Sequence, residues 1–209
     1  MIRKDIIVLI TRKLPEKIEK KLKENFNVIF NKTDKKLSYL ELKKKISEVD
    51  ILIPCVSDTI DASIIKSAKK LKLIANFGNG VDNLDLVTAR EENVIVTNTP
   101  DVLTEDTADL VLTLVLMISR KVVEAQKKIS GGRWSGWGPS ETMGERIRGK
   151  NFGIIGMGRI GKAVAKRLNI LGVKIFYHNR NRLQKNEEKV LKAKYFENLD
   201  LMITHCDIV

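Results

Sequence analysis

The stretch GIIGMGRIG, Gly153 to Gly161, predicts a phosphate-binding turn between a strand and a helix. Gly156, Gly158 and Gly161 have the spacing G-x-G-x-x-G, directly after an apolar run and at the start of a helix-period segment. In such a turn the first glycine permits a tight bend, the second lets the backbone approach a pyrophosphate, and the third lets the helix pack closely on the strand. A purely structural glycine turn is the alternative, but the strand before the glycines and the second strand after them favour dinucleotide binding. The predicted cofactor-binding residues of this turn are Gly156, Met157, Gly158, Arg159, Ile160 and Gly161.

The end of the next predicted strand indicates which dinucleotide is bound. An acidic residue that binds the ribose 2′-hydroxyl is expected about 20 residues after the glycines. Asn179 stands there instead, followed by Arg180 and Arg182. Asparagine removes the repulsion that a carboxylate would exert on a 2′-phosphate, and guanidinium groups suit phosphate. These three residues therefore predict a preference for NADP(H), with NAD(H) use still possible; the alternative is that the arginines are merely solvated.

Short apolar runs alternate with helix-period segments along most of the chain, and this alternation indicates an α/β protein with parallel sheets. The predicted strands are 6–10, 27–31, 50–54, 72–76, 94–98, 151–155, 173–178 and 194–196. The predicted helices are 15–24, 38–47, 61–69, 84–92, 105–129, 159–171, 182–191 and 198–203.

The longest predicted helix, 105–129, has acidic residues in its first turn, an apolar middle and lysines at its end. The apolar middle predicts burial on all sides, as in a helix between two domains. The Gly- and Ser-rich segment 130–144 follows and carries Trp134 and Trp137. We expect this irregular segment to lie against a partner surface, because two exposed tryptophans would be costly.

Composition narrows the class of protein further. The chain has 209 residues and a formal net charge of +12, but its lysines are mixed with glutamates in amphipathic stretches. This pattern favours solvated helix faces over a nucleic-acid surface. Cys55 and Cys206 are isolated, which predicts buried thiols in a reducing compartment and no metal site. No apolar run reaches the roughly 18–20 residues of a membrane span, so we expect a cytoplasmic protein that binds neither membrane nor nucleic acid.

The last residues, CDIV (206–209), predict the start of another strand. An open doubly wound sheet needs further strands beyond this point. The sequence therefore leads us to expect a second domain that is incomplete at its C-terminal end.

Four stretches together resemble the D-isomer-specific 2-hydroxyacid dehydrogenases, and they cover most of the chain. They are NFGNGVDNLD (76–85), TNTPDVLTEDTADLVLTLVL (97–116), GRWSGWGP (132–139) and GKNFGIIGMGRIGKAVAKRLNILGVKIFYHNR (149–180). The resemblance implies a flavodoxin-like substrate domain at 1–103 and a C-terminally incomplete NAD(P)-binding Rossmann domain, a doubly wound parallel sheet, at 104–209, with a cleft between them. Within the family, GIIGMGRIG followed by YHNR looks most like the glyoxylate/hydroxypyruvate reductases that use NADPH.

The resemblance also implies roles for single residues. The backbone amides of Asn79 and Gly80 would hold the substrate carboxylate, and Asn79 would approach the nicotinamide. Without the resemblance, GNGVDN alone would be interpreted as a glycine turn. Thr107 would contact the cofactor at its nicotinamide end, and residues 120–150 would pack in a homodimer.

The family's catalytic arginine, glutamate and histidine lie beyond the stretch that this chain reaches, so none maps onto a residue here. We expect His178 and His205 to have surface or packing roles.

The resulting hypothesis is an oxidoreductase that transfers hydride from NADPH to a small 2-oxoacid, glyoxylate or hydroxypyruvate, to give the 2-hydroxyacid. The 209 residues by themselves are expected to be inactive. Two alternatives stay open. One is another D-2-hydroxyacid dehydrogenase, of the phosphoglycerate, lactate or formate type. The other is a non-catalytic dinucleotide-binding module similar to a corepressor.

Overall fold

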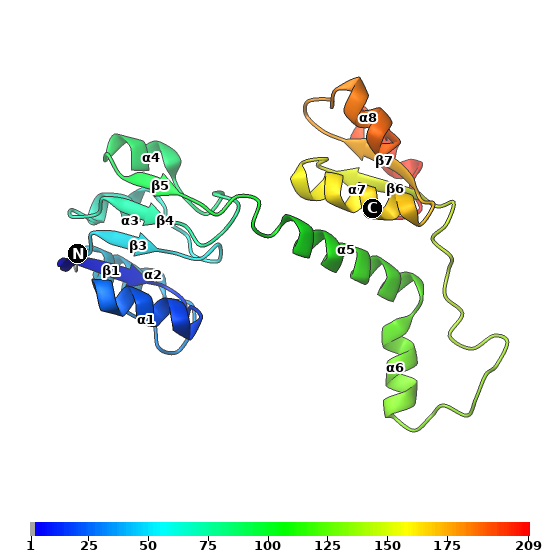
Figure 1. Cartoon of the computed structure of the whole chain (residues 1–209), viewed down its shortest axis with the longest axis horizontal. Helices are drawn as coiled ribbons and strands as arrows, with labels where there is room; N and C mark the ends of the chain where they lie inside the picture. The colour runs from blue at the N-terminus through cyan, green and yellow to red at the C-terminus, as the bar shows by residue number, and fades with distance from the viewer. Residues whose placement is uncertain (1–2) are drawn as a thin grey trace. The chain divides into compact units, whose positions relative to one another are not determined.

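The computed structural model describes residues 3–209, which form two compact units, Met1–Val102 and Leu103–Val209 (Figure 1). Each unit contains its own parallel sheet and its own apolar core. The α/β class predicted from the alternating pattern is confirmed.

The first unit is a five-stranded parallel sheet in the order β2-β1-β3-β4-β5. Its strands are β1 (Arg3–Ile10), β2 (Phe26–Ile29), β3 (Ile51–Ile53), β4 (Leu73–Ala75) and β5 (Ile95–Thr97). Its helices are α1 (Glu16–Asn25), α2 (Tyr39–Ile46), α3 (Ala62–Ser67) and α4 (Leu86–Glu91). This strand order is that of flavodoxin-like doubly wound folds.

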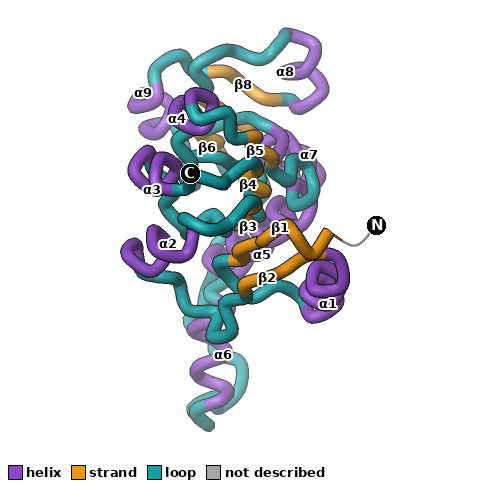
Figure 2. The backbone as a smooth tube through the Cα atoms, turned by 90° about the vertical axis from the view of Figure 1, so that its left-hand side faces the viewer, coloured by secondary structure: helices purple, strands orange, loops and turns teal. Residues whose placement is uncertain are grey.

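The helices of this unit cover both faces of the sheet. Figure 2 shows α1 on one face and α2, α3 and α4 on the other. Successive side chains of β1 divide between the two faces, because strand residues alternate in direction. Leu9 belongs to the larger core beneath α2, α3 and α4, whereas Val8 and Ile10 belong to a smaller core beside α1. Burial on both faces explains why residues 6–10 of β1 are a continuous apolar run.

The second unit is a three-stranded parallel sheet in the order β6-β7-β8. Its strands are β6 (Asn151–Ile155), β7 (Lys174–His178) and β8 (Ala193–Tyr195). Its helices are α5 (Thr104–Ser119), α6 (Val122–Ser130), α7 (Arg159–Ile170), α8 (Lys185–Leu191) and α9 (Leu199–Thr204). The predicted final strand is present as a parallel bridge between Ile208 and Phe152, along the edge of β6.

The prediction of one long helix over 105–129 is wrong. The helix breaks at Arg120 and Lys121, where Lys121 adopts a left-handed backbone with φ of 49°. The break is held by the amide of Glu145, which donates to the Ser119 carbonyl at 2.7 Å. Gly144 lies so close to this turn that a Cβ at its position would be 2.5 Å from the same carbonyl oxygen. The cause is therefore a tertiary contact with a residue 26 positions away, which helix periodicity does not encode.

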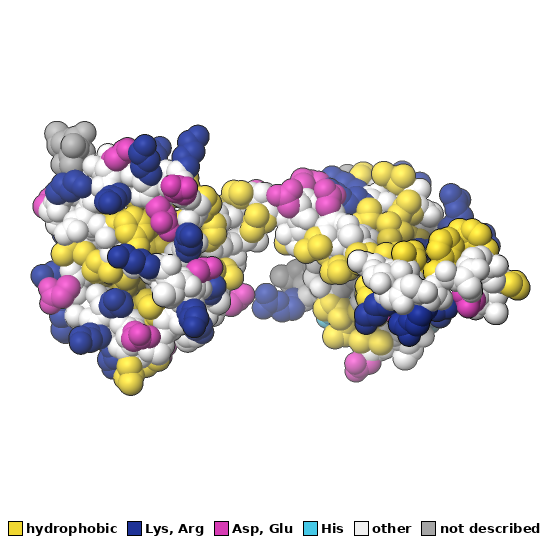
Figure 3. Space-filling model, turned by 90° about the horizontal axis from the view of Figure 1, so that it is seen from below, with side chains coloured by type: hydrophobic (Ala, Val, Ile, Leu, Met, Phe, Trp, Pro, Cys, Tyr) yellow, Lys and Arg dark blue, Asp and Glu magenta, His cyan; other side chains and the backbone are white. Residues whose placement is uncertain are grey.

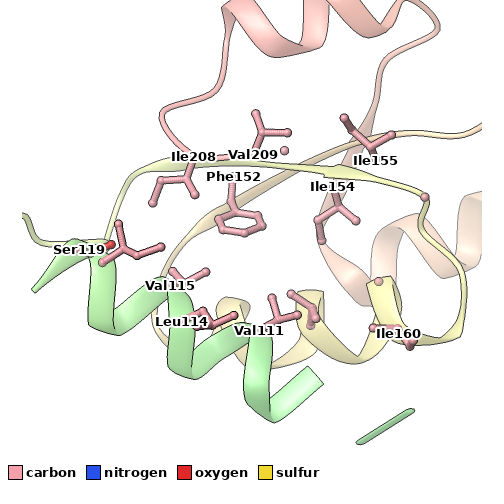
Figure 4. A pocket seen from close by; sticks show the side chains of 15 residues that line it. Val111, Leu114, Val115, Ser119, Phe152, Ile154, Ile155, Ile160, Ile208 and Val209 are labelled. Carbon is pink, nitrogen blue, oxygen red and sulfur yellow. The ribbon is translucent and has the colours of Figure 1, made fainter. Parts of the chain in front are cut away.

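Burial of the apolar middle of α5 on all sides is not observed within residues 3–209. Val111 and Val115 pack against the core of the second unit, but Leu110, Leu114 and Ile118 are 57%, 48% and 76% exposed. One face of α5 packs on α7, and no described element covers the opposite face. A pocket of about 470 Å³ opens beside α5; Figure 4 shows Leu114 and Val115 facing Phe152 and Ile154 of β6 across it.

Several local predictions concern helix ends and the surface. The Asp61 side chain accepts a hydrogen bond from the Ile64 amide, so the predicted N-cap of α3 is confirmed.

On the face drawn in Figure 3, Lys and Arg side chains of the first unit are interspersed with Asp and Glu. No helix within residues 3–209 is long and apolar enough to cross a membrane.

Candidate dinucleotide site and carboxylate loop

The glycine turn joins β6 to α7, and two of its three glycines are required by the fold itself. Gly156 has φ of +95°, a left-handed conformation that other residues rarely adopt. A Cβ on Gly161 would lie 2.5 Å from the Gly156 carbonyl oxygen, so only glycine lets α7 begin this close to the turn. Gly158 differs, because a Cβ there would meet no atom within 4 Å. The protein has no steric need for a glycine at 158, whereas a ligand that approaches this backbone would need one.

The start of α7 follows directly after Gly158, which is its N-cap residue. The first turn of an α-helix has amides without intrahelical partners and carries a partial positive charge. Helix α7 begins at Arg159. Its first i→i−4 hydrogen bond runs from the Lys162 amide to the carbonyl of Gly158, the N-cap residue, at 2.9 Å. The predicted Arg159 and Ile160 therefore lie in this first turn, where an anion such as a pyrophosphate is stabilised.

Asn179 contacts the turn directly. Its Oδ1 accepts a hydrogen bond from the Met157 amide at 2.6 Å, which links the end of β7 to the glycine turn. The Met157 side chain is buried in the core below, so this residue contributes its backbone to the site. Because Oδ1 is engaged, the part of the Asn179 amide left for a ligand is the donor, Nδ2.

The two predicted arginines after Asn179 have different surroundings. Arg180 is exposed and forms no hydrogen bond or ion pair with any residue of the part described. Arg182 is held by Glu188 of α8 through two hydrogen bonds of 2.8 Å, one from Nε and one from Nη2. Only Arg180 therefore presents its whole guanidinium group to a ligand.

Glu188 also accepts a hydrogen bond from the buried Tyr177 hydroxyl at 2.6 Å. Hydrogen bonds from Arg182 and Tyr177 lower the pKa of Glu188 to about 2. Burial, followed by the bond to the Glu188 carboxylate, raises the pKa of Tyr177 to about 12. The pair is thus an ionised carboxylate and a neutral phenol at neutral pH.

Thr107 lies at the end of the first turn of α5 and is half-buried. It precedes Val111 by one helical turn, and Val111 lines the same pocket as the glycine turn. Arg167 of α7 fixes this end of α5 through ion pairs of 2.8 Å to Glu105 and 2.7 Å to Asp109. The position of Thr107 relative to α7 is therefore defined by contacts within the second unit.

In the first unit, the loop after β4 has backbone amides available for an anion. The carbonyl of Asn79 accepts from the Asn98 side chain at 2.7 Å, and that of Gly80 accepts from the Asn76 side chain at 2.9 Å. The amides of Asn79 and Gly80 donate to no acceptor within the described residues. Asn83 braces the loop by exchanging hydrogen bonds with Asn76 at 3.3 and 3.2 Å. Side chains thus hold the carbonyls of this loop, and its two amides are left to donate to a ligand.

Five residues that were not predicted as site residues hold the two loops through hydrogen bonds. They are Asn76, Asn83, Asn98, Tyr177 and Glu188. A signal was present for two of them, because Asn76 and Asn98 each end an apolar run that was predicted as a strand. Polar residues at the carboxyl ends of parallel strands meet at one edge of the sheet.

Each of the two histidines has one ring nitrogen beside a backbone carbonyl. Nδ1 of His178 lies 3.0 Å from the Phe196 carbonyl, and Nδ1 of His205 lies 2.7 Å from the Leu201 carbonyl. Within residues 3–209, no three His, Cys, Asp or Glu side chains gather as metal ligands.

Residues 8–203 match the sequence family of the D-isomer specific 2-hydroxyacid dehydrogenase catalytic domain. The chain belongs to the D-isomer specific 2-hydroxyacid dehydrogenase family. Among its relatives is a glyoxylate reductase from Thermococcus onnurineus, 39% identical over 206 residues, which are 97% of this chain and 61% of that protein.

Two solved structures have the same fold as this chain. A Thermus thermophilus protein is 39% identical with a TM-score of 0.86, over 97% of this chain and 63% of its own. The NADPH-dependent glyoxylate/hydroxypyruvate reductase from Sinorhizobium meliloti, in complex with NADP and malonate, is 28% identical with a TM-score of 0.81, over 98% of this chain and 62% of its own. The chain thus spans about three fifths of the length of the curated relatives it matches. Membership of this family supports NAD(P) as the cofactor.

The open space at Gly158 predicts a separation between stability and cofactor binding. Gly158→Ala should leave the melting temperature of the chain unchanged, because its new Cβ meets no protein atom. It should weaken NADPH binding by about tenfold or more, since a methyl group would stand where a pyrophosphate approaches. Thermal unfolding and NADPH fluorescence titration measure the two quantities.

Gly161→Ala is the matched comparison. Its Cβ collides with the Gly156 carbonyl, so we expect both a lower melting temperature and weaker binding. Wild-type NADPH affinity in Gly158→Ala would contradict pyrophosphate binding at this turn.

Proposed function

We propose that the protein to which this chain belongs reduces a small 2-oxoacid, such as glyoxylate or hydroxypyruvate, to the 2-hydroxyacid with hydride from NADPH. One observation carries the proposal. The chain has two loops whose backbone suits anions, each at the carboxyl end of a parallel strand: the glycine turn after β6 and the loop after β4. A dinucleotide pyrophosphate and a substrate carboxylate are the two anions that such a reaction must bind.

The printed functions of the relatives support the same choice of substrate. The Thermococcus onnurineus relative is a glyoxylate reductase, and the Sinorhizobium meliloti protein is a glyoxylate/hydroxypyruvate reductase that holds malonate, a carboxylate, together with NADP.

When bound, the reduced nicotinamide supplies the hydride for the substrate carbonyl carbon. The residues of this chain bind and orient the cofactor and the substrate. The turn Gly156–Gly161 seats the pyrophosphate, and Thr107 contacts the nicotinamide end of the cofactor. The amides of Asn79 and Gly80 hold the substrate carboxylate, which fixes the direction of the adjacent carbonyl. We assign the proton transfer to no residue of this chain.

The preference for NADPH rests on Asn179 and Arg180. With Oδ1 of Asn179 held by the Met157 amide, Nδ2 is the group that meets the ribose 2′ position. A donor there attracts a 2′-phosphate, and the exposed Arg180 adds a cation. A hydrogen bond to a charged group contributes about 1.5–3 kcal/mol, so one or two such bonds favour NADPH by about tenfold to a few hundredfold.

Asn179→Asp combined with Arg180→Ala tests this preference. Aspartate keeps an acceptor for the Met157 amide but replaces the donor with a negative charge. We expect NADPH affinity to fall by at least about tenfold, while NADH affinity changes by less than about threefold. Fluorescence titration with each cofactor gives the two dissociation constants.

Asn181→Asp is the control, because it adds the same charge at an exposed position two residues away. If the ratio of the two dissociation constants stays at its wild-type value in the double variant, the proposed NADPH preference is wrong.

Substrate binding is tested at Gly80. Gly80→Pro removes the amide hydrogen, whereas Gly80→Ala keeps it and adds a Cβ that meets only Asp82 Oδ2, at an ordinary distance of 3.6 Å. We expect glyoxylate binding to the NADPH complex to weaken by about tenfold in the proline variant, because a hydrogen bond to a charged group is lost. The alanine variant should bind within about twofold of wild type. Equal glyoxylate affinity in both variants, measured by NADPH fluorescence, would place the carboxylate elsewhere.

We also propose that residues 120–150 form a homodimer interface. Trp137 is 94% exposed and packs edge-to-face on Trp134, with ring centroids 5.7 Å apart. Ile129 and Met143 are also exposed nearby in sequence, and such apolar side chains favour a partner surface. Sedimentation that shows a monomer at micromolar concentration would contradict this proposal.

A further inference from the structure

The loop that follows β7 is held by a network that reaches across to α8. Glu188 accepts both hydrogen bonds of the Arg182 fork, each 2.8 Å long, and a third of 2.6 Å from the Tyr177 hydroxyl. The Tyr177 oxygen in turn accepts the backbone amide of Leu183 at 3.0 Å. Tyr177 is fully buried and the Glu188 side chain is 11% exposed, so the network is rooted in the core of the second unit.

A second set of contacts holds the other end of the same loop. The Asn179 side chain accepts from the Met157 amide, and the Asn179 carbonyl accepts from the Tyr195 hydroxyl at 3.2 Å. The Arg182 guanidinium lies 5.3 Å from the centre of the Tyr195 ring. Residues 179 and 183 are thus both fixed, and Arg180 lies between them.

The charges explain why Arg182 stays with Glu188. A bidentate arginine–carboxylate pair is stronger than a single ionic hydrogen bond. If Arg182 moved to a phosphate, it would leave a nearly buried carboxylate without its cation, close to a second anion. Arg180 has no such commitment within the described residues.

We propose that Tyr177, Arg182 and Glu188 are positioning residues for cofactor selectivity, which hold the 179–183 loop so that Arg180, and not Arg182, meets the 2′-phosphate of NADPH. This inference rests on the proposed NADPH preference. It departs from the sequence-based expectation that Arg182 binds the phosphate itself.

The test removes the ion pair in two backgrounds. Arg182→Ala with Glu188→Gln leaves the net charge unchanged and abolishes the fork. The measured quantity is the dissociation constant of NADH divided by that of NADPH, obtained by fluorescence titration of the full chain. General damage to the fold weakens both cofactors and leaves this ratio in place, whereas a displaced Arg180 lowers it.

We expect the ratio to fall by about three- to tenfold when the pair is removed from the wild-type chain, as is typical of coupled neighbours. In a chain that already carries Arg180→Ala, removal of the pair should change the ratio by less than about twofold, because the cation that the network positions is gone and Asn179 is held separately by the Met157 amide. A fall of equal size in both backgrounds would show that Arg182 binds the phosphate independently and would overturn the inference. An unchanged ratio in both backgrounds would overturn it as well.

Two further variants complete the design. Tyr177→Phe removes one hydroxyl without any change in charge and should give the same dependence on Arg180, so it replaces the double variant if that protein does not fold. Glu187→Gln is the matched control, since Glu187 is the neighbouring residue of α8 and pairs with Lys162 instead.

The wild-type ratio separates the two proposals. A wild-type chain without a preference for NADPH would overturn the proposed cofactor and this inference together. A wild-type preference that survives removal of the network would overturn the inference alone.

Discussion

The hydrogen bond from the Met157 amide to the Asn179 side chain is the contact on which the cofactor half of this structure depends. It ties the end of β7 to the turn after β6, so the two strand ends act as one surface. Gly156 bends the chain and Gly161 lets α7 begin beside the bend, but neither defines where the loop after β7 lies. Asn179 fixes one end of that loop, and the contacts of Arg182 and Leu183 with Glu188 and Tyr177 fix the other.

Much of the fold could be predicted from the sequence because short apolar runs alternate with helix-period segments. The predicted strands lie within a few residues of the observed ones in both sheets. The exception was the region around Arg120 and Lys121, where no glycine or proline signals a break. The helix ends there because Glu145 bonds back to Ser119, and such a contact between distant residues leaves no local pattern. Periodicity detects which face of a segment is apolar, but not which neighbour will cover it.

The candidate site was predictable to a different depth in each unit. The glycine spacing identified the turn because Gly156 and Gly161 each meet a steric constraint of the fold, and Gly158 leaves open space beside the backbone. The position of Asn179 was also evident, but its division into an acceptor for the turn and a donor for a ligand was not. Arg182 shows the limit most clearly. The sequence presents it as an available cation, whereas Glu188, six residues away, occupies its fork once α8 packs beside β7.

The division of the Asn179 amide has a consequence for how cofactor choice can change in this family. Aspartate and asparagine both offer an oxygen to the Met157 amide, so either residue satisfies the turn. They differ only in the second group, which is an acceptor in one and a donor in the other. In the proposed division, the structural and the selective roles reside on different atoms of one side chain, so an exchange at this position would alter the proposed preference without loss of the turn. The other determinant in the proposal is the placement of Arg180, which the network around Glu188 would hold. The two arginines of this loop therefore differ in their surroundings, since Arg182 belongs to the network and Arg180 is exposed.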